Sequence, residues 1–166
     1  MRAVIEVGNA ALLPDSLDSD IASVLPGGYG TSYHALVDRA DLQPGEILLV
    51  LGASGGVGMA AVQIGNVLGA NVIAAVSTDE KDAAARAAGA HHVIRYDQTP
   101  IREAIDQVTD GRGVDVVYDP VGGEMTEQVL RSTRWNGRLL VIGFAAGDIP
   151  SLPLNLPLLK GNSIMG

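Results

Sequence analysis

The residue types most suggestive of chemistry in this chain are glycines that separate two apolar segments. Ile47–Leu51 runs directly into Gly52-Ala53-Ser54-Gly55-Gly56-Val57-Gly58. Glycine adopts backbone angles closed to other residues, and without a Cβ it lets a phosphate approach the main chain. A helix that begins there directs its unpaired first-turn N–H groups at that phosphate. The order of strand, glycines and helix therefore predicts a seat for a pyrophosphate.

Two dinucleotide fingerprints overlap in this glycine run. Ala53–Gly58 fits G-x-G-x-x-G with alanine in the first position, whereas Gly52, Gly56 and Gly58 fit G-x-x-x-G-x-G. The second pattern would indicate a short-chain dehydrogenase, in which a lysine follows the catalytic tyrosine by four residues. None of the tyrosines has lysine at that spacing, and the glycine run lies far from the start of the chain. We therefore favour A-x-G-x-x-G, with Gly52 as a strand-end residue.

The end of the second predicted strand bears on the choice between NAD and NADP. An acidic residue about 20 positions after the glycines would bind the ribose 2′-hydroxyl of NAD. Here the strand ends without a carboxylate, and Ser77 and then Lys81 follow it. Lys81 can offer a point charge to a 2′-phosphate, although Asp79, Glu80 and Asp82 surround it. The pattern favours NADPH over NADH, while a solvated helix face remains an alternative for Lys81.

Composition narrows the class of protein. The chain has 166 residues, a hydrophobic content of 47%, an aromatic content of 4% and a net charge of −8. Aliphatic strands buried on both faces are typical of α/β proteins with a parallel sheet. Basic residues are scattered singly, so neither nucleic acid nor an anionic membrane is expected as a partner. Without cysteine, disulfides and thiolate metal sites are excluded, and we expect a soluble, cytoplasmic protein.

Strand-like and helix-like segments alternate through most of the chain. Strands are predicted at 47–51, 71–76, 93–96, 114–119, 138–142 and from about 163, and helices at 57–68, 79–88, 101–109 and about 123–133. This alternation predicts a Rossmann α/β fold, with a doubly wound parallel sheet in the order 3-2-1-4-5-6 and helices on both faces. Glycines 69 and 89 are expected to cap helix ends, and residues 150–157 to form an extended loop.

The N-terminal part of the chain differs from this pattern. We divide the chain into a lead-in segment, 1–43, and a dinucleotide-binding domain, 44–166. The lead-in is expected to contain a β-like stretch at Arg2–Val7 and a short helix capped by Asp15 or Ser16. A second helix should begin at Thr31 or Ser32 and end near residue 39.

Several ordered motifs together resemble a known family. They are Tyr29-Gly30-Thr31-Ser32-Tyr33-His34-Ala35-Leu36, Ala53–Gly58, Asp119-Pro120-Val121-Gly122-Gly123, Gly137–Phe144 and Leu158-Leu159-Lys160-Gly161. In this order they are similar to medium-chain dehydrogenase/reductases, and specifically to their zinc-independent quinone oxidoreductase branch. The resemblance implies NADPH-dependent two-electron reduction of quinones or of other electron-poor alkenes and carbonyls.

The same resemblance implies roles for individual residues. Ser54, Gly55, Gly56 and Val57 would hold the pyrophosphate, Ser77, Lys81 and Tyr96 would contact the 2′-phosphate, and Thr31, Val121, Gly143 and Phe144 would line the nicotinamide half. No metal is expected, because the chain has no cysteine and the adjacent His91 and His92 would point to opposite faces of a strand. No catalytic residue is assigned; Tyr29, Tyr33 and His34 are conceivable proton donors.

Relatives in this family carry a substrate-binding domain built from sequence on either side of the segment matched here. The resemblance therefore implies that this chain is the cofactor domain of a longer enzyme, which meets its small-molecule substrate through that other domain and forms a homodimer. A chain of this kind would bind NADPH with little turnover by itself. The alternative is a non-catalytic module that senses the nucleotide for a partner.

Overall fold

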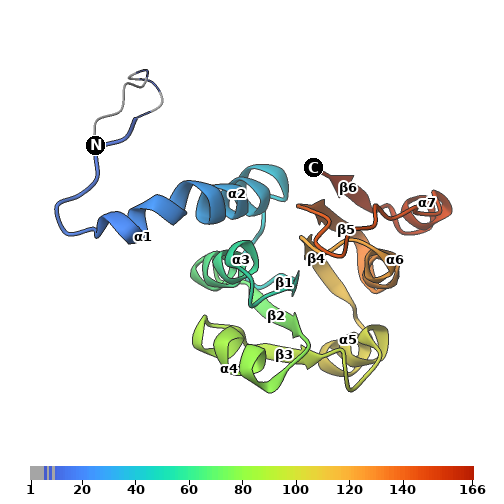
Figure 1. The fold of residues 1–166 in the computed structure, drawn as a ribbon. Helices are drawn as coiled ribbons and strands as arrows, with labels where there is room; N and C mark the ends of the chain where they lie inside the picture. Colours follow the sequence, from blue (N-terminus) through green and yellow to red (C-terminus); the bar gives the residue numbers. More distant parts are fainter. Residues whose placement is uncertain (1–5, 7, 9) are drawn as a thin grey trace.

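A sheet of six parallel strands forms the centre of the molecule in the computed structural model, which describes residues 6, 8 and 10–166. The strand order is β3-β2-β1-β4-β5-β6 (Figure 1). The strands are β1 (Ile47–Leu51), β2 (Asn71–Val76), β3 (His92–Arg95), β4 (Val114–Asp119), β5 (Thr133–Val141) and β6 (Ser163–Met165). The predicted Rossmann order is thus confirmed.

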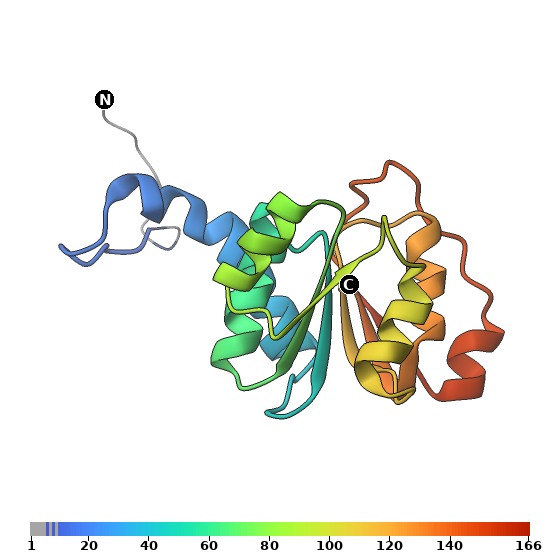
Figure 2. The ribbon, with the colours of Figure 1, turned by 90° about the horizontal axis from the view of Figure 1, so that it is seen from below.

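Helices cover both faces of this sheet (Figure 2). On one face lie α3 (Gly56–Val67) and α4 (Asp79–Ala87), and on the other lie α5 (Ile101–Thr109), α6 (Glu124–Arg131) and the short α7 (Asn155–Lys160). Each face of the sheet has its own hydrophobic core, and alternate residues of β1 point into one or the other. Leu48 and Val50 pack toward α3, and Leu49 and Leu51 pack toward α5 and α6. All four side chains are fully buried, as parallel strands between two helical layers require.

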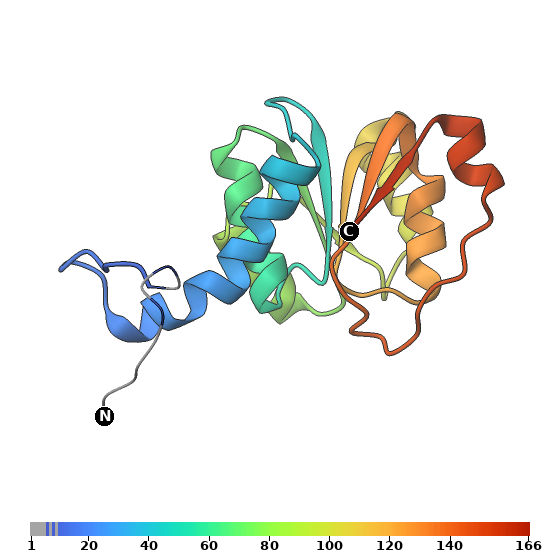
Figure 3. The same cartoon turned by 90° about the horizontal axis from the view of Figure 1, so that it is seen from above.

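Residues 19–39 of the lead-in segment form one continuous helical rod alongside α3 (Figure 3). It consists of α1 (Ser19–Val24), η2 (Leu25–Tyr29), α2 (Gly30–Tyr33) and η3 (His34–Arg39), and the residues that join these pieces keep right-handed helical angles. The C-terminal end of the rod packs into the hydrophobic core on the α3 face of the sheet, where Leu36 is fully buried.

Two predictions for this segment were wrong. The cap is Asp18, whose carboxylate accepts a hydrogen bond from the Asp20 N–H at 2.8 Å, rather than Asp15 or Ser16. No second helix begins at Thr31 or Ser32, because the first one continues through Pro26. The η segments have wider turns, in which an N–H bonds to the carbonyl five residues earlier, as the Gly30 N–H does to the Leu25 carbonyl. These wider turns let the helix continue past Pro26, which has no N–H to donate. The predicted β-like stretch at 2–7 lies outside the described residues except for residue 6.

Elsewhere most boundaries agree with the predictions to within one or two residues, with two exceptions. Strand β5 begins at Thr133 rather than 138, and its pairing with β4 shifts register in this early part. Helix α7 begins at Asn155, within the predicted loop 150–157. Pro157 is compatible with this helix because it falls in the first turn, where its missing N–H costs no hydrogen bond. Gly69 and Gly89, with φ of 79° and 104°, end α3 and α4 in the predicted way.

No helix in the described part of the chain is both long enough and apolar enough to span a bilayer.

Candidate cofactor site

The glycine turn lies at the carboxyl edge of the sheet, between β1 and α3. Gly52 has a φ of +56°, and its carbonyl accepts a hydrogen bond from the Gly55 N–H at 2.9 Å, which closes the turn. Gly55 has extended angles and caps α3 without a side chain. The first-turn N–H groups of α3 are therefore available to an anion at this edge.

The glycines of this turn have different steric functions. A Cβ on Gly58 would lie 2.2 Å from the Gly52 carbonyl oxygen, so only glycine permits this approach of helix to strand. A Cβ on Gly52 would meet a methyl group of Val121 at 3.2 Å. A Cβ on Gly56 would meet nothing within 4 Å. The open space at Gly56 is what a bound phosphate needs, and the tight contact at Gly58 fixes the helix that presents its amides.

A buried hydroxyl ties the lead-in rod to this turn. Ser32 Oγ lies 2.9 Å from the carbonyl oxygens of both Gly28 and Val57, and 2.8 Å from the hydroxyl of Tyr118 on β4. Tyr118 is fully buried; burial raises the pKa of its hydroxyl, while the hydrogen bond to Ser32 acts in the opposite direction. The exposed side chain of Thr31 is thus anchored through its neighbour to both α3 and the sheet.

An apolar cavity of about 440 Å³ opens between this rod and the first turn of α3. Its walls include Val24, Tyr29, Val57 and Met59. The hydroxyl of Tyr29 hydrogen-bonds to the Gln63 side chain, which holds the ring against α3. The cavity lies beside Gly56, so it adjoins the proposed pyrophosphate seat.

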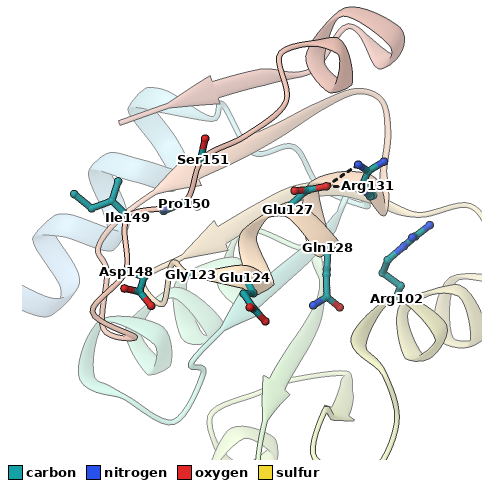
Figure 4. Close-up of a pocket in the computed structure, with 10 residues that line it drawn as sticks. All are labelled: Arg102, Gly123, Glu124, Glu127, Gln128, Arg131, Asp148, Ile149, Pro150 and Ser151. Carbon is teal, nitrogen blue, oxygen red and sulfur yellow. Dashed lines mark hydrogen bonds and ion pairs between the residues drawn. The ribbon is translucent and has the colours of Figure 1, made fainter.

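A second cavity, of about 500 Å³, lies beside the first turn of α6 (Figure 4). It is lined by charged side chains of both signs, including Arg102, Glu124 and Asp148. Glu127 and Arg131, one turn apart on α6, form an ion pair of 2.6 Å in its wall. None of the predicted cofactor residues lines it. This cavity is therefore separate from the glycine turn.

Ser77 and Lys81 meet where β2 ends. Thr78 caps α4 by accepting the Lys81 N–H, and the first turn of the helix brings Lys81 Nζ to 3.2 Å from Ser77 Oγ. Tyr96 follows β3 and donates its N–H to the carbonyl of Val76 at 3.2 Å, which places it beside the end of β2. Its ring packs against the core on the α5 side. The structure thus brings Ser77 and Lys81 into contact and places the Tyr96 backbone beside the end of β2, with its ring on the α5 face of the sheet.

Arg95 lies at the same corner, where β2 and β3 end and α4 begins, and was missed in the sequence analysis. Its guanidinium makes two hydrogen bonds of 2.9 Å to Asp97 and a third to Asp79, the first residue of α4. The hydrogen bonds from Arg95 hold the pKa of Asp97 below its usual range. The only sequence signal was an arginine directly before Tyr96 at a predicted strand end.

The loops that follow β4 and β5 form the other side of the site. Asp119 is 2% exposed, and its carboxylate accepts hydrogen bonds from the N–H groups of Val121 and Gly122 and, at 2.6 Å, from the Thr126 hydroxyl. These bonds fix the turn that presses Val121 onto Gly52. The sequence pattern indicates no role for Asp119 beyond its place in the Asp119–Gly123 motif.

Gly143 and Phe144 extend the same surface. The Gly143 N–H points to the Asp119 carbonyl, and a Cβ on Gly143 would lie 3.4 Å from the Pro120 carbonyl oxygen. The ring of Phe144 lies against Gly122 and is 39% exposed. Val121, Gly143 and Phe144 are therefore contiguous, with Val121 against Gly52 of the glycine turn. Thr31 lies on the lead-in rod next to Ser32, whose hydroxyl bonds to the Val57 carbonyl.

The histidines and the conceivable proton donors lie in different surroundings. His34 pairs with Asp38 at 2.8 Å on the surface, and Tyr33 is exposed. His91 is exposed, but its Nδ1 accepts the Val72 N–H at 3.1 Å, so it has a structural bond that the sequence did not suggest. Among residues 6, 8 and 10–166, no three His, Asp or Glu side chains gather as a metal site would require.

Known proteins show the same architecture. A family model described as zinc-binding dehydrogenase matches residues 56–166. Quinone oxidoreductase-like protein 2 of Mus musculus is 43% identical over 155 residues, which cover 93% of this chain and 44% of that protein. The chain thus spans less than half the length of the curated relatives it matches first.

Solved structures agree with this assignment. Escherichia coli quinone oxidoreductase complexed with NADPH gives a TM-score of 0.83 at 30% identity, over 93% of this chain and 48% of that one. A mycobacterial protein complexed with NADPH gives a TM-score of 0.86 at 30% identity, with the same coverage. The chain has no cysteine, and its described residues gather no His, Asp and Glu cluster of the kind a zinc site needs. The chain belongs to the zinc-binding dehydrogenase family, within the quinone oxidoreductase branch of the medium-chain dehydrogenase/reductases.

Proposed function

We propose that this chain is the NADP(H)-binding domain of an oxidoreductase that transfers hydride from NADPH to a quinone or to an activated alkene or carbonyl. The observation that carries the proposal is the contact between Lys81 and Ser77 at the end of β2, a strand without a terminal carboxylate. An ammonium group and a hydroxyl at this position suit a 2′-phosphate rather than a free 2′-hydroxyl. The NADPH complexes of two structural neighbours support the same cofactor.

We propose the roles of the site residues that the family resemblance implies. The amides of Ser54, Gly55, Gly56 and Val57 would bind the pyrophosphate, with α3 contributing its dipole. Ser77, Lys81 and Tyr96 would bind the 2′-phosphate. Thr31, Val121, Gly143 and Phe144 would orient the nicotinamide ring. Bound NADPH supplies the hydride; the chain's residues hold the ring and exclude water from it.

The division into a lead-in, 1–43, and a dinucleotide-binding domain, 44–166, belongs to this proposal, with the buried Leu36 as the junction between them. We propose that the substrate is bound by a domain contributed by other sequence, and that this chain turns over little by itself. The exposed Ile164 on the edge strand β6 and Leu158 and Leu159 on α7 suit a homodimer. We expect the protein in the cytoplasm, without nucleic-acid or membrane partners.

Calorimetry with NADPH and NADH tests the cofactor assignment. The wild-type chain should bind NADPH more tightly, and Lys81→Ala should weaken NADPH binding about tenfold while leaving NADH binding unchanged, because the lost charge faces only the 2′-phosphate. Arg86→Ala is the matched control, since it removes another exposed cation of α4 that pairs with Asp82 instead. Equal affinities for the two nucleotides, or an unaffected Lys81→Ala variant, would contradict the proposal.

Turnover separates the proposed enzyme domain from a nucleotide-sensing module. Rapid quinone reduction by the 166-residue chain alone would contradict the expectation of low turnover. If the chain binds NADPH but a protein that includes the substrate domain reduces neither quinones nor electron-poor alkenes, the sensing function becomes the better description.

A further inference from the structure

The corner proposed for the 2′-phosphate contains more carboxylates than cations. The first turn of α4 carries Asp79, Glu80 and Asp82 around Lys81. A free carboxylate near a phosphate dianion opposes its binding, since like charges at this range repel even in a surface environment. Selectivity for NADPH therefore depends on how these carboxylates are occupied.

Two of the three are held by arginines from different directions. Asp82 pairs with Arg86 one turn further along α4. Asp79 is 95% exposed by its side chain, yet it contacts the guanidinium of Arg95 on the neighbouring strand. The Arg95 side chain, at the end of β3, is only 14% exposed. It is also fixed by the two bonds to Asp97, so it is a rigid partner rather than a mobile one.

The position of Asp79 makes this pairing important. It lies two residues after Ser77 and two before Lys81, the residues that contact one another. In register, Arg95 is opposite Val76, the residue before Ser77. Arg95 thus holds the Asp79 carboxylate against β3, while the Lys81 ammonium is directed to Ser77 at the end of β2.

We propose that Arg95 determines nucleotide specificity indirectly: by holding Asp79 in an ion pair, it keeps that carboxylate from opposing a 2′-phosphate at Ser77 and Lys81. Arg95 is a positioning residue in this scheme, and the inference rests on the proposed NADPH-binding function. The nucleotide class it selects is one with a 2′-phosphate on the adenosine ribose.

Four variants of the 166-residue chain test this role by calorimetry with NADPH, NADH and 2′,5′-ADP. Arg95→Gln should weaken binding of NADPH and of 2′,5′-ADP about tenfold, the scale of one added repulsion near a dianion, and change NADH binding by less than about twofold. Adding Asp79→Asn to Arg95→Gln should restore NADPH affinity to within about twofold of wild type. Adding Asp97→Asn instead should not restore it. Arg86→Gln alone should have less effect than Arg95→Gln, because the Asp82 side chain is only 24% exposed and pairs toward the C-terminal end of α4, whereas the Asp79 side chain is 95% exposed.

The outcomes separate this inference from competing explanations. If Asp79→Asn fails to rescue Arg95→Gln, Arg95 acts by contacting the phosphate or by shaping the loop, and the indirect role is overturned. If Asp97→Asn restores NADPH affinity to Arg95→Gln and Asp79→Asn does not, the indirect role through Asp79 is overturned as well. If wild type prefers NADPH and Arg95→Gln has no effect, only this inference fails. If wild type binds both nucleotides equally, the proposed cofactor preference itself fails. Thermal unfolding of each variant checks that the fold is retained.

Discussion

The glycine turn and the α4 corner would hold two phosphates of one cofactor by different physical means. The turn relies on backbone amides and on the absence of side chains, with Gly58 packed directly on the Gly52 carbonyl. The α4 corner relies on exposed side chains, Ser77 and Lys81, whose charge balance depends on Arg95. The first arrangement is steric and tolerates almost no change. The second is electrostatic, and single substitutions can tune it without disturbing the fold.

The largest expected effect comes from the steric side, with Gly58→Ala. The added methyl would lie 2.2 Å from the Gly52 oxygen and 2.9 Å from Ala53 Cα, both backbone atoms. Helix α3 must then move away from β1, and the free energy of unfolding should fall by about 2–3 kcal/mol. Urea denaturation measures this loss, and NADPH binding should fall with it. Retention of wild-type stability would show that α3 can shift freely, and the glycine turn would then not be sterically fixed in the way that distinguishes it from the α4 corner.

Gly56→Ala makes the same chemical change where the chain leaves room. Gly56 is the first residue of α3, and no atom lies within 4 Å of the added Cβ. Stability should stay the same or rise by about 0.5 kcal/mol, because alanine favours the helix and restricts the unfolded chain. NADPH affinity should nevertheless fall on the order of 100-fold, since the methyl occupies the approach of the pyrophosphate. Unchanged affinity in calorimetry would place the pyrophosphate elsewhere.

This contrast also explains what could be predicted from the sequence. The strand order and the glycine turn follow from local patterns: aliphatic runs, helical spacing and glycines at a strand-to-helix junction. The sequence places Ser77 and Lys81 just after a strand that ends without a carboxylate, and in the structure these two side chains touch. Features that depend on neighbours within one element were therefore accessible.

Features that depend on register between distant elements were not. The pairing of Arg95 with Asp79 requires knowing that β3 lies beside β2 with Arg95 opposite Val76. The Ser32–Tyr118 hydrogen bond joins residues 86 positions apart. The continuous lead-in rod was not predicted for a different reason. Pro26, Gly27 and Gly28 disfavour a helix locally, but packing against α3 stabilises one with wider turns.

Tyr118→Phe tests the link between the lead-in rod and the sheet, with an intermediate effect. It removes one buried hydrogen bond and leaves Ser32 its carbonyl acceptors, so stability at neutral pH should fall by about 1 kcal/mol. Burial raises the pKa of Tyr118 above its ordinary value of 10.0. The unfolded chain therefore loses this proton first, and wild-type stability should decline as the pH rises above about 10.

The alkaline decline offers an internal check on Tyr118→Phe. Because phenylalanine has no proton to lose, part of that decline should be absent from the variant, so the stability difference between the two proteins should shrink between pH 8 and pH 11. Chemical denaturation at both pH values measures it. A difference that is independent of pH would show that the Tyr118 hydroxyl does not titrate differently in the folded chain.

The smallest expected effects on stability lie at the α4 corner. Lys81 is exposed, and the Arg86–Asp82 pair is an i,i+4 surface contact. Lys81→Ala and Arg86→Gln should each change the free energy of unfolding by less than about 0.5 kcal/mol, because solvent screens such interactions. Yet Lys81→Ala should weaken NADPH binding more than Arg86→Gln does. If Lys81→Ala destabilised the fold as strongly as Gly58→Ala, the corner would be structural, and its separation from the glycine turn as a tunable specificity element would not hold.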